Sequence, residues 1–261
     1  MLNLSTAQID AWIVFYAYPL ARILGLIATA PLWSTAGIPR QTRLILGFAI
    51  TIAIAPVLPT MPQIQPASLA GLWILGQQIL IGIAMGFAAR LVFAAIDMAG
   101  TYIGFQMGLG FATFYDPIDG AQTPVVAEFI GLLALLLFLS LDGHLLYIST
   151  LAQSFHAIPV GPEALSPNSW RNLVELAEKI FSAGLLLSLP IIVALMITNV
   201  ALGILTKAAP QLNLMALGFP LTLMGGFVCI ALSLNYLTVP LQALYDYALH
   251  AMLGFAVPNI Q

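Results

Sequence analysis

The chain has 261 residues, of which 61% are hydrophobic and 7% are charged, with a formal net charge of −3. A soluble domain averages about 25% charged residues, so the composition argues against a water-soluble protein and predicts an integral membrane protein. The chain shows no strand-like alternation and no basic run, which argues against a membrane β-barrel and against a nucleic-acid partner and favours an all-α membrane protein.

The chain contains apolar runs of a length suited to membrane helices. About 20 apolar residues are needed to cross roughly 30 Å of hydrocarbon, and we expect roughly six such segments, several broken by proline or glycine. The apolar runs are residues 11–34, 44–59, 68–89, 91–115, 129–141, 180–206 and 208–245.

The first apolar run contains a single arginine, Arg22. An arginine near the bilayer centre costs about 2.5–3.5 kcal/mol on insertion scales, so its charge must be either hydrated or paired. One interpretation is that the side chain extends to the membrane surface. The other is that it pairs with a carboxylate such as Asp97 or Glu128, within this chain or across a subunit contact.

Glycines at a spacing of four residues follow in the third and fourth runs. Gly82 and Gly86 form a G-x-x-x-G pair, and Arg90 is predicted to end that helix. Gly100 and Gly104 begin a second row that continues to Gly108. Such a row lets another backbone approach closely, either from this chain's own helices or from a partner subunit or pore. The acidic, turn-rich loop at residues 116–128 favours the second interpretation.

The second half of the chain predicts a turn, a polar helix and a hairpin. Asp142-Gly143-His144 is typical of a turn, and residues 145–159 suit a short helix along the membrane surface. In the most water-compatible segment, Ser166-Pro167 suits an N-cap followed by a first-turn proline. Two long apolar runs meet at Lys207, which predicts a C-terminal helical hairpin.

Known catalytic motifs are missing, and the three histidines show no ligand spacing. Two Tyr-Asp pairs, Tyr115-Asp116 and Tyr245-Asp246, are compatible with an intramembrane aspartyl protease, in which two facing aspartates activate water. The Gly-x-Gly-Asp element of such enzymes is absent, however. A small-solute channel or secondary transporter is the other alternative, because broken helices with acidic residues suit it. No catalytic residue, metal site or cofactor is predicted.

Residues 104–117, GFQMGLGFATFYDP, closely resemble the signature of the FliR family of bacterial flagellar and type III secretion export proteins. Further segments agree with this family in content and in order along the chain. They are Gly37-Ile38-Pro39-Arg40, Asp142-Gly143-His144, Ala209-Pro210-Gln211-Leu212-Asn213 and Gly218-Phe219-Pro220-Leu221.

The resemblance implies a non-enzymatic core subunit of the flagellar export gate in the bacterial inner membrane, within the basal body. FliP-like and FliQ-like subunits, an FlhB-like switch protein, membrane lipid and unfolded substrates in transit are the implied partners. It also implies that residues 1–180 form a FliP-like part with kinked helices, and that residues 181–261 form a FliQ-like hairpin.

In this family the loop matching residues 104–122, here called the plug segment, is thought to close the pore. Phe111 and Phe114 are the preferred plug residues, because large apolar rings at a constriction exclude water and ions. The full set assigned to the plug is Gly104, Phe105, Met107, Gly108, Gly110, Phe111, Phe114, Asp116 and Pro117. The set assigned to subunit packing is Arg22, Gly82, Gly86, Gly100, Pro210, Gln211 and Asn213.

Overall fold

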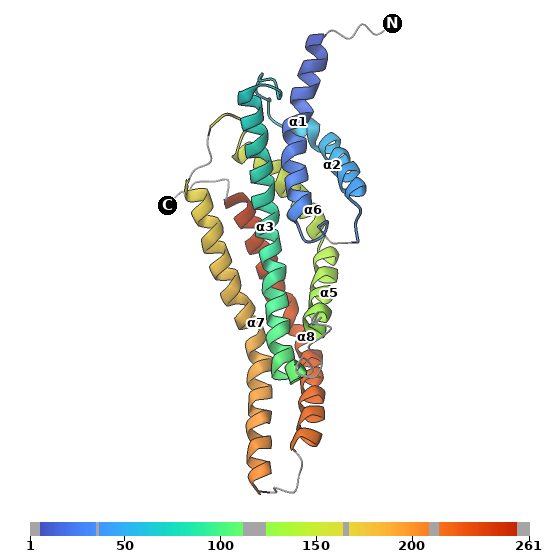
Figure 1. The fold of residues 1–261 in the computed structure, drawn as a ribbon, viewed down its shortest axis with the longest axis vertical. Helices are drawn as coiled ribbons and strands as arrows, with labels where there is room; N and C mark the ends of the chain where they lie inside the picture. The colour runs from blue at the N-terminus through green and yellow to red at the C-terminus, as the bar shows by residue number, and fades with distance from the viewer. Residues whose placement is uncertain (1–5, 35–36, 112–123, 164–166, 209–213, 255–261) are drawn as a thin grey trace. The chain divides into compact units, whose positions relative to one another are not determined.

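The structure, a computed structural model, describes residues 6–34, 37–111, 124–163, 167–208 and 214–254. Its regular elements are all helical within those ranges, which confirms the all-α prediction (Figure 1). The helices are α1 (Thr6–Thr29), α2 (Arg40–Ile54), α3 (Leu69–Gln106), α5 (Val125–Ser140), α6 (Gly143–Ala157), α7 (Pro167–Ala208) and α8 (Leu214–Gly254), with 3₁₀ turns η1 (Ala55–Val57) and η2 (Leu109–Phe111).

The helices are long and apolar enough to confirm a membrane protein. Among the described residues, five helices could cross a membrane by length and composition, or six if α5 and α6 form one broken span. The longest candidate spans lie in α3, α7 and α8. The number agrees with the roughly six segments expected from the sequence.

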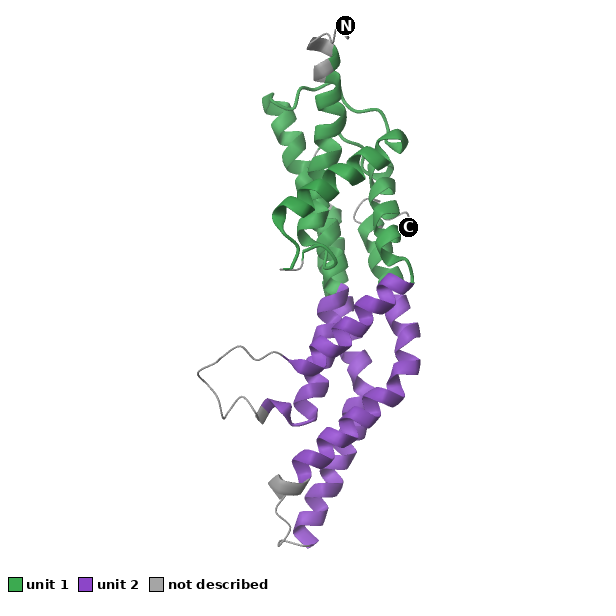
Figure 2. Cartoon of the chain, turned by 90° about the vertical axis from the view of Figure 1, so that its right-hand side faces the viewer, with its two compact units in different colours: residues 1–91, 141–178, 245–261 green, residues 92–140, 179–244 purple. Residues whose placement is uncertain are grey.

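The chain divides into two compact units, coloured separately in Figure 2. Unit 1 comprises residues 1–91, 141–178 and 245–261, and unit 2 comprises residues 92–140 and 179–244. Both units therefore combine segments from before and after residue 180. The assignment of residues 1–180 and 181–261 to a FliP-like and a FliQ-like part stays a prediction.

One residue expected to end a helix, and several prolines expected to interrupt the apolar runs, lie inside continuous helices. Arg90 was predicted to end a helix, but α3 continues through it to Gln106. Arginine has a high helix propensity, so a charge that limits a membrane span does not limit the helix. Pro190 lies within α7, and Pro220 and Pro240 lie within α8.

Other predicted boundaries agree with the structure. Asp142 has a left-handed backbone with φ 54°, between α5 and α6, as expected of a turn. Helix α7 begins at Pro167, whose fixed φ suits the first helical turn. Helices α7 and α8 form the predicted C-terminal hairpin, and α7 begins well before residue 180 (Figure 1).

Candidate functional site

The plug segment starts in the last turn of α3, in unit 2, and leaves the helix through a hydrogen-bonded turn. The backbone N–H of Met107 donates to Ile103 O at 2.9 Å, and that of Gly108 donates to Phe105 O at 3.0 Å. Gly108 has φ 88°, a left-handed conformation that glycine adopts without strain. The chain therefore leaves the helix direction at Gly108.

The glycine row of α3 packs against α5. A Cβ atom on Gly100 would collide with the backbone of Ala127, and one on Gly104 would lie 3.7 Å from Val126 Cβ. Nearby in unit 2, the rings of Phe93 and Phe138 meet edge to face with centroids 6.0 Å apart. Gly100 therefore packs against α5 of the same chain, and its assignment to subunit packing stays a prediction.

Met107 is an anchoring residue of this segment. Its side chain is fully buried, and it lies across Gly226 of α8, so that a Cβ at position 226 would collide with it. The hydroxyl of Thr222, one turn earlier in α8, is shared between Met107 O at 3.2 Å and Phe219 O of its own helix at 3.0 Å. Met107 can be assigned to the plug segment from the sequence, whereas Thr222 and Gly226 cannot, because no local pattern of residues marks a contact between positions more than 100 residues apart.

The remaining plug residues are only partly described. Phe105 is 58% exposed, and a Cβ at Gly110 would lie 3.0 Å from its ring. The side chain of Phe111 lies outside the described residues, as do Phe114, Asp116 and Pro117. Pro210, Gln211 and Asn213, which were assigned to subunit packing, also lie outside them.

In unit 1 the G-x-x-x-G pair packs against α1 of the same chain. A Cβ on Gly82 would collide with Arg22 O, and one on Gly86 would lie 2.8 Å from Leu26 O. Gly25 of α1 is equally close to α3, since a Cβ on Gly25 would lie 2.6 Å from Ile79 O. Gly82 and Gly86 therefore bring α1 and α3 into backbone contact within unit 1, and their assignment to packing between subunits stays a prediction.

Arg22 is fully buried where α1 meets α3 and α6. Its Nε donates to Gln78 Oε1 at 2.8 Å, and its Nη1 donates to Ser154 Oγ at 3.0 Å. Its Nη2 donates to Ile158 O at 2.8 Å, and its guanidinium carbon lies 4.1 Å from the Phe155 ring centroid.

These neutral partners differ from both expectations for Arg22. The side chain does not reach a solvent-exposed position, and among the described residues its three nitrogens bond to an amide, a hydroxyl and a carbonyl. Ile158 is the C-cap of α6, where the helix dipole is negative and favours a cation. The expected partners Asp97 and Glu128 belong to unit 2, where both are exposed.

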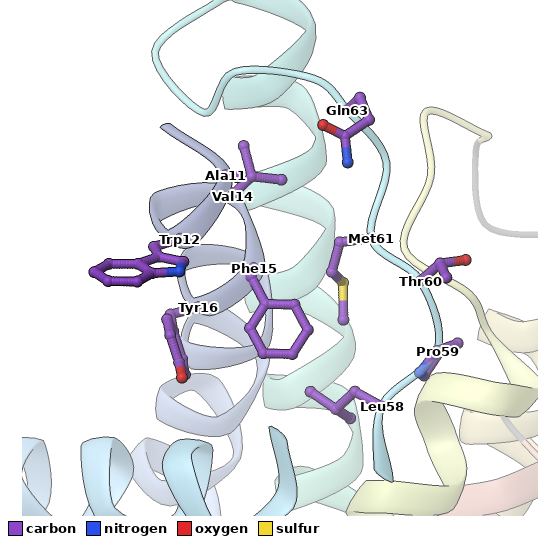
Figure 3. A pocket seen from close by; sticks show the side chains of 10 residues that line it. All are labelled: Ala11, Trp12, Val14, Phe15, Tyr16, Leu58, Pro59, Thr60, Met61 and Gln63. Carbon is purple, nitrogen blue, oxygen red and sulfur yellow. The ribbon is translucent and has the colours of Figure 1, made fainter. Parts of the chain in front are cut away.

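A separate cavity of about 510 Å³ lies in unit 1, between the start of α1 and residues 58–63 (Figure 3). The side chains of Phe15, Leu58 and Met61 converge there. The hydroxyl-bearing side chains Tyr16 and Thr60 also line it, and none of the described lining residues is a carboxylate, histidine, lysine or cysteine.

The model for bacterial export proteins, family 1, matches residues 13–248 of the chain. The flagellar biosynthetic protein FliR of Escherichia coli (strain K12) is 46% identical over 231 residues, which cover 88% of each chain. FliR of Pectobacterium carotovorum subsp. carotovorum is 44% identical over 236 residues, 90% of this chain and 89% of the relative. FliR of Bacillus subtilis (strain 168) is 27% identical over 235 residues, 88% and 90% of the two chains.

Proposed function

Because the chain belongs to the bacterial export proteins of family 1 and is a component of the flagellar export apparatus, we propose that it is a membrane subunit of the export gate. In this role it helps to form the conduit through which unfolded substrates leave the cell. The observation that carries the proposal is the match over residues 13–248, which includes nearly all of both compact units.

The plug segment closes this conduit when no substrate passes. Support comes from its beginning: α3 ends in a buried anchor at Met107, and a left-handed glycine then turns the chain away from the helix. Apolar rings after such a turn suit a constriction, since they exclude water and ions. Phe111 and Phe114 supply these rings.

The gate forms only together with other subunits. Many large apolar side chains of α7 and α8 are exposed, including Ile197, Ile204, Met224 and Leu232. Surfaces of this kind are covered by lipid or by neighbouring helices in a membrane. We assign the FliP-like and FliQ-like subunits and the FlhB-like protein as protein partners, and the bacterial inner membrane as the location. The subunit carries no catalytic activity of its own.

An ion-leak measurement tests the plug. Phe111→Ala with Phe114→Ala should raise the ion conductance of the reconstituted gate, because it removes both rings from the constriction. Phe129→Ala with Phe181→Ala is the matched control, since these two exposed rings lie on α5 and α7. Equal conductance of the two double variants would refute the closing role of Phe111 and Phe114.

Co-purification tests the assembly. Affinity capture of the tagged chain in mild detergent should recover two other small apolar membrane proteins in constant ratio. A chain that is monodisperse alone and moves a small solute in vesicles would instead establish the transporter alternative.

A further inference from the structure

Two residues of α8, Thr222 and Gly226, hold the end of α3 and are here called the Met107 socket. We propose that the Met107 socket is a positioning element of the gate, which sets the resting position of the plug segment. The inference rests on the proposed function, in which that segment closes the conduit. It assigns to α8 a role that the sequence comparison does not describe.

The side-chain contact in the socket covers the whole length of the methionine. A Cβ at position 226 would collide with Met107 Cγ and would lie 2.7 Å from both its Sδ and its Cε. Since three consecutive atoms are involved, turning the end of the side chain would not relieve the contact. Met107 is also fully buried, so it has no open space to enter. Only glycine at position 226 is compatible with this position of Met107.

The socket also holds the backbone. Thr222 is buried, and its hydroxyl lies 3.2 Å from Met107 O and 3.0 Å from Phe219 O of its own helix, so its proton is shared between the two carbonyls. Helix α8 therefore contacts both the main chain and the side chain of Met107, the residue that follows α3. The next residue, Gly108, has φ 88°, so the chain changes direction directly after the contact. A shift of Met107 therefore acts within the plug segment itself, directly before its turn at Gly108.

Two adjacent glycines in α8 provide a matched test. Gly226→Ala should displace Met107, whereas Gly225→Ala should not, because a Cβ at position 225 meets only Leu195 Cδ2 at 3.8 Å. Both substitutions have the same effect on helix propensity, so the difference between them reports the contact with Met107. Overpacking of this kind should increase the displaced population, and hence the ion conductance, by about tenfold.

The experiment uses the complete gate complex, purified with its partner subunits and reconstituted into vesicles for conductance measurements. Met107→Ala adds no atoms and removes all three that crowd position 226, so it should raise the conductance by losing the anchor. Met107→Ala combined with Gly226→Ala should conduct no more than Met107→Ala alone, because the atoms with which the new Cβ collides are gone. Such non-additivity is expected only of residues in contact.

Each result separates the socket from the plug. A complex with Gly226→Ala that assembles and is as tight as one with Gly225→Ala overturns the inference. If Gly226→Ala prevents assembly, Met107→Ala decides, and a tight gate with that variant overturns the inference. If one of these unchanged conductances is found while Phe111→Ala with Phe114→Ala raises the conductance, only the positioning role of the Met107 socket is overturned. A tight gate with the two phenylalanines replaced overturns the plug, and the socket with it.

Discussion

Replacing Arg22 with leucine should destabilise unit 1 by roughly 2–6 kcal/mol, through loss of donors to buried acceptors. Gln78 Oε1 and Ile158 O each lose a charged donor, and each such loss costs about 1–3 kcal/mol. Ser154 loses less, because its hydroxyl also donates to Leu151 O at 2.7 Å. The contact between the guanidinium and the Phe155 ring disappears as well.

One effect opposes this loss. Burying a guanidinium costs several kcal/mol of hydration free energy, and leucine avoids that cost. In the folded chain, however, three hydrogen bonds, an aromatic face and the carbonyl end of α6 already stabilise the Arg22 charge. Leucine restores none of these interactions and leaves the acceptors in place. We therefore expect the loss of the hydrogen bonds to exceed the gain in hydration.

The measurement is the thermal unfolding midpoint of the purified gate complex in detergent. For a chain of this size, 1 kcal/mol changes the midpoint by about 2–4 °C, so Arg22→Leu should lower it on the order of 10 °C. Arg90→Leu is the matched control, because Arg90 is exposed on α3 and its loss should have little effect. A second variant, Arg22→Leu with Gln78→Leu, should recover part of the loss because the amide acceptor is removed with its donor.

Equal midpoints for Arg22→Leu and Arg90→Leu would refute the reasoning. That result would mean that the three hydrogen bonds of Arg22 contribute no net stability. A further decrease on adding Gln78→Leu would show instead that the amide has another role in unit 1.

Two further predictions concern glycines. Gly82→Ala should destabilise the α1–α3 contact by about 1–3 kcal/mol, because its Cβ meets the backbone of Arg22. Gly76→Ala on the same helix is the control: its Cβ meets nothing within 4 Å, so it should stabilise the helix by about 0.5–1 kcal/mol. Equal unfolding midpoints for the two variants would contradict this prediction. Gly108→Ala should cost about 1–2 kcal/mol, because φ 88° is unfavourable for a residue with a Cβ, and an unchanged midpoint in the purified complex would show that the backbone there relaxes freely.

Helix positions could largely be predicted from the sequence, and helix ends could be predicted where a special residue marks them. Pro167 and Asp142 act within one turn of the chain, so their effect can be read from neighbouring residues. Arg90 was misleading because it was judged by its cost in a membrane rather than by its helix propensity. At this position the helix propensity of arginine favours a continued helix, whereas its cost in a membrane disfavours one. The structure follows the helix propensity.

The amino-acid sequence by itself determined the class of protein, since only helices and closed barrels satisfy the backbone polar groups in a membrane and the chain lacks the alternation of a barrel. It also marked Gly82, Gly86 and Gly100 as places of close approach. Only the tertiary structure decided what approaches them: α1 for the first two and α5 for the third. It likewise brought Gln78 and Ser154, 56 and 132 residues away, to Arg22. The physical reason is that periodicity describes the surface of one helix, whereas a contact depends on the partner that the folded chain places against it.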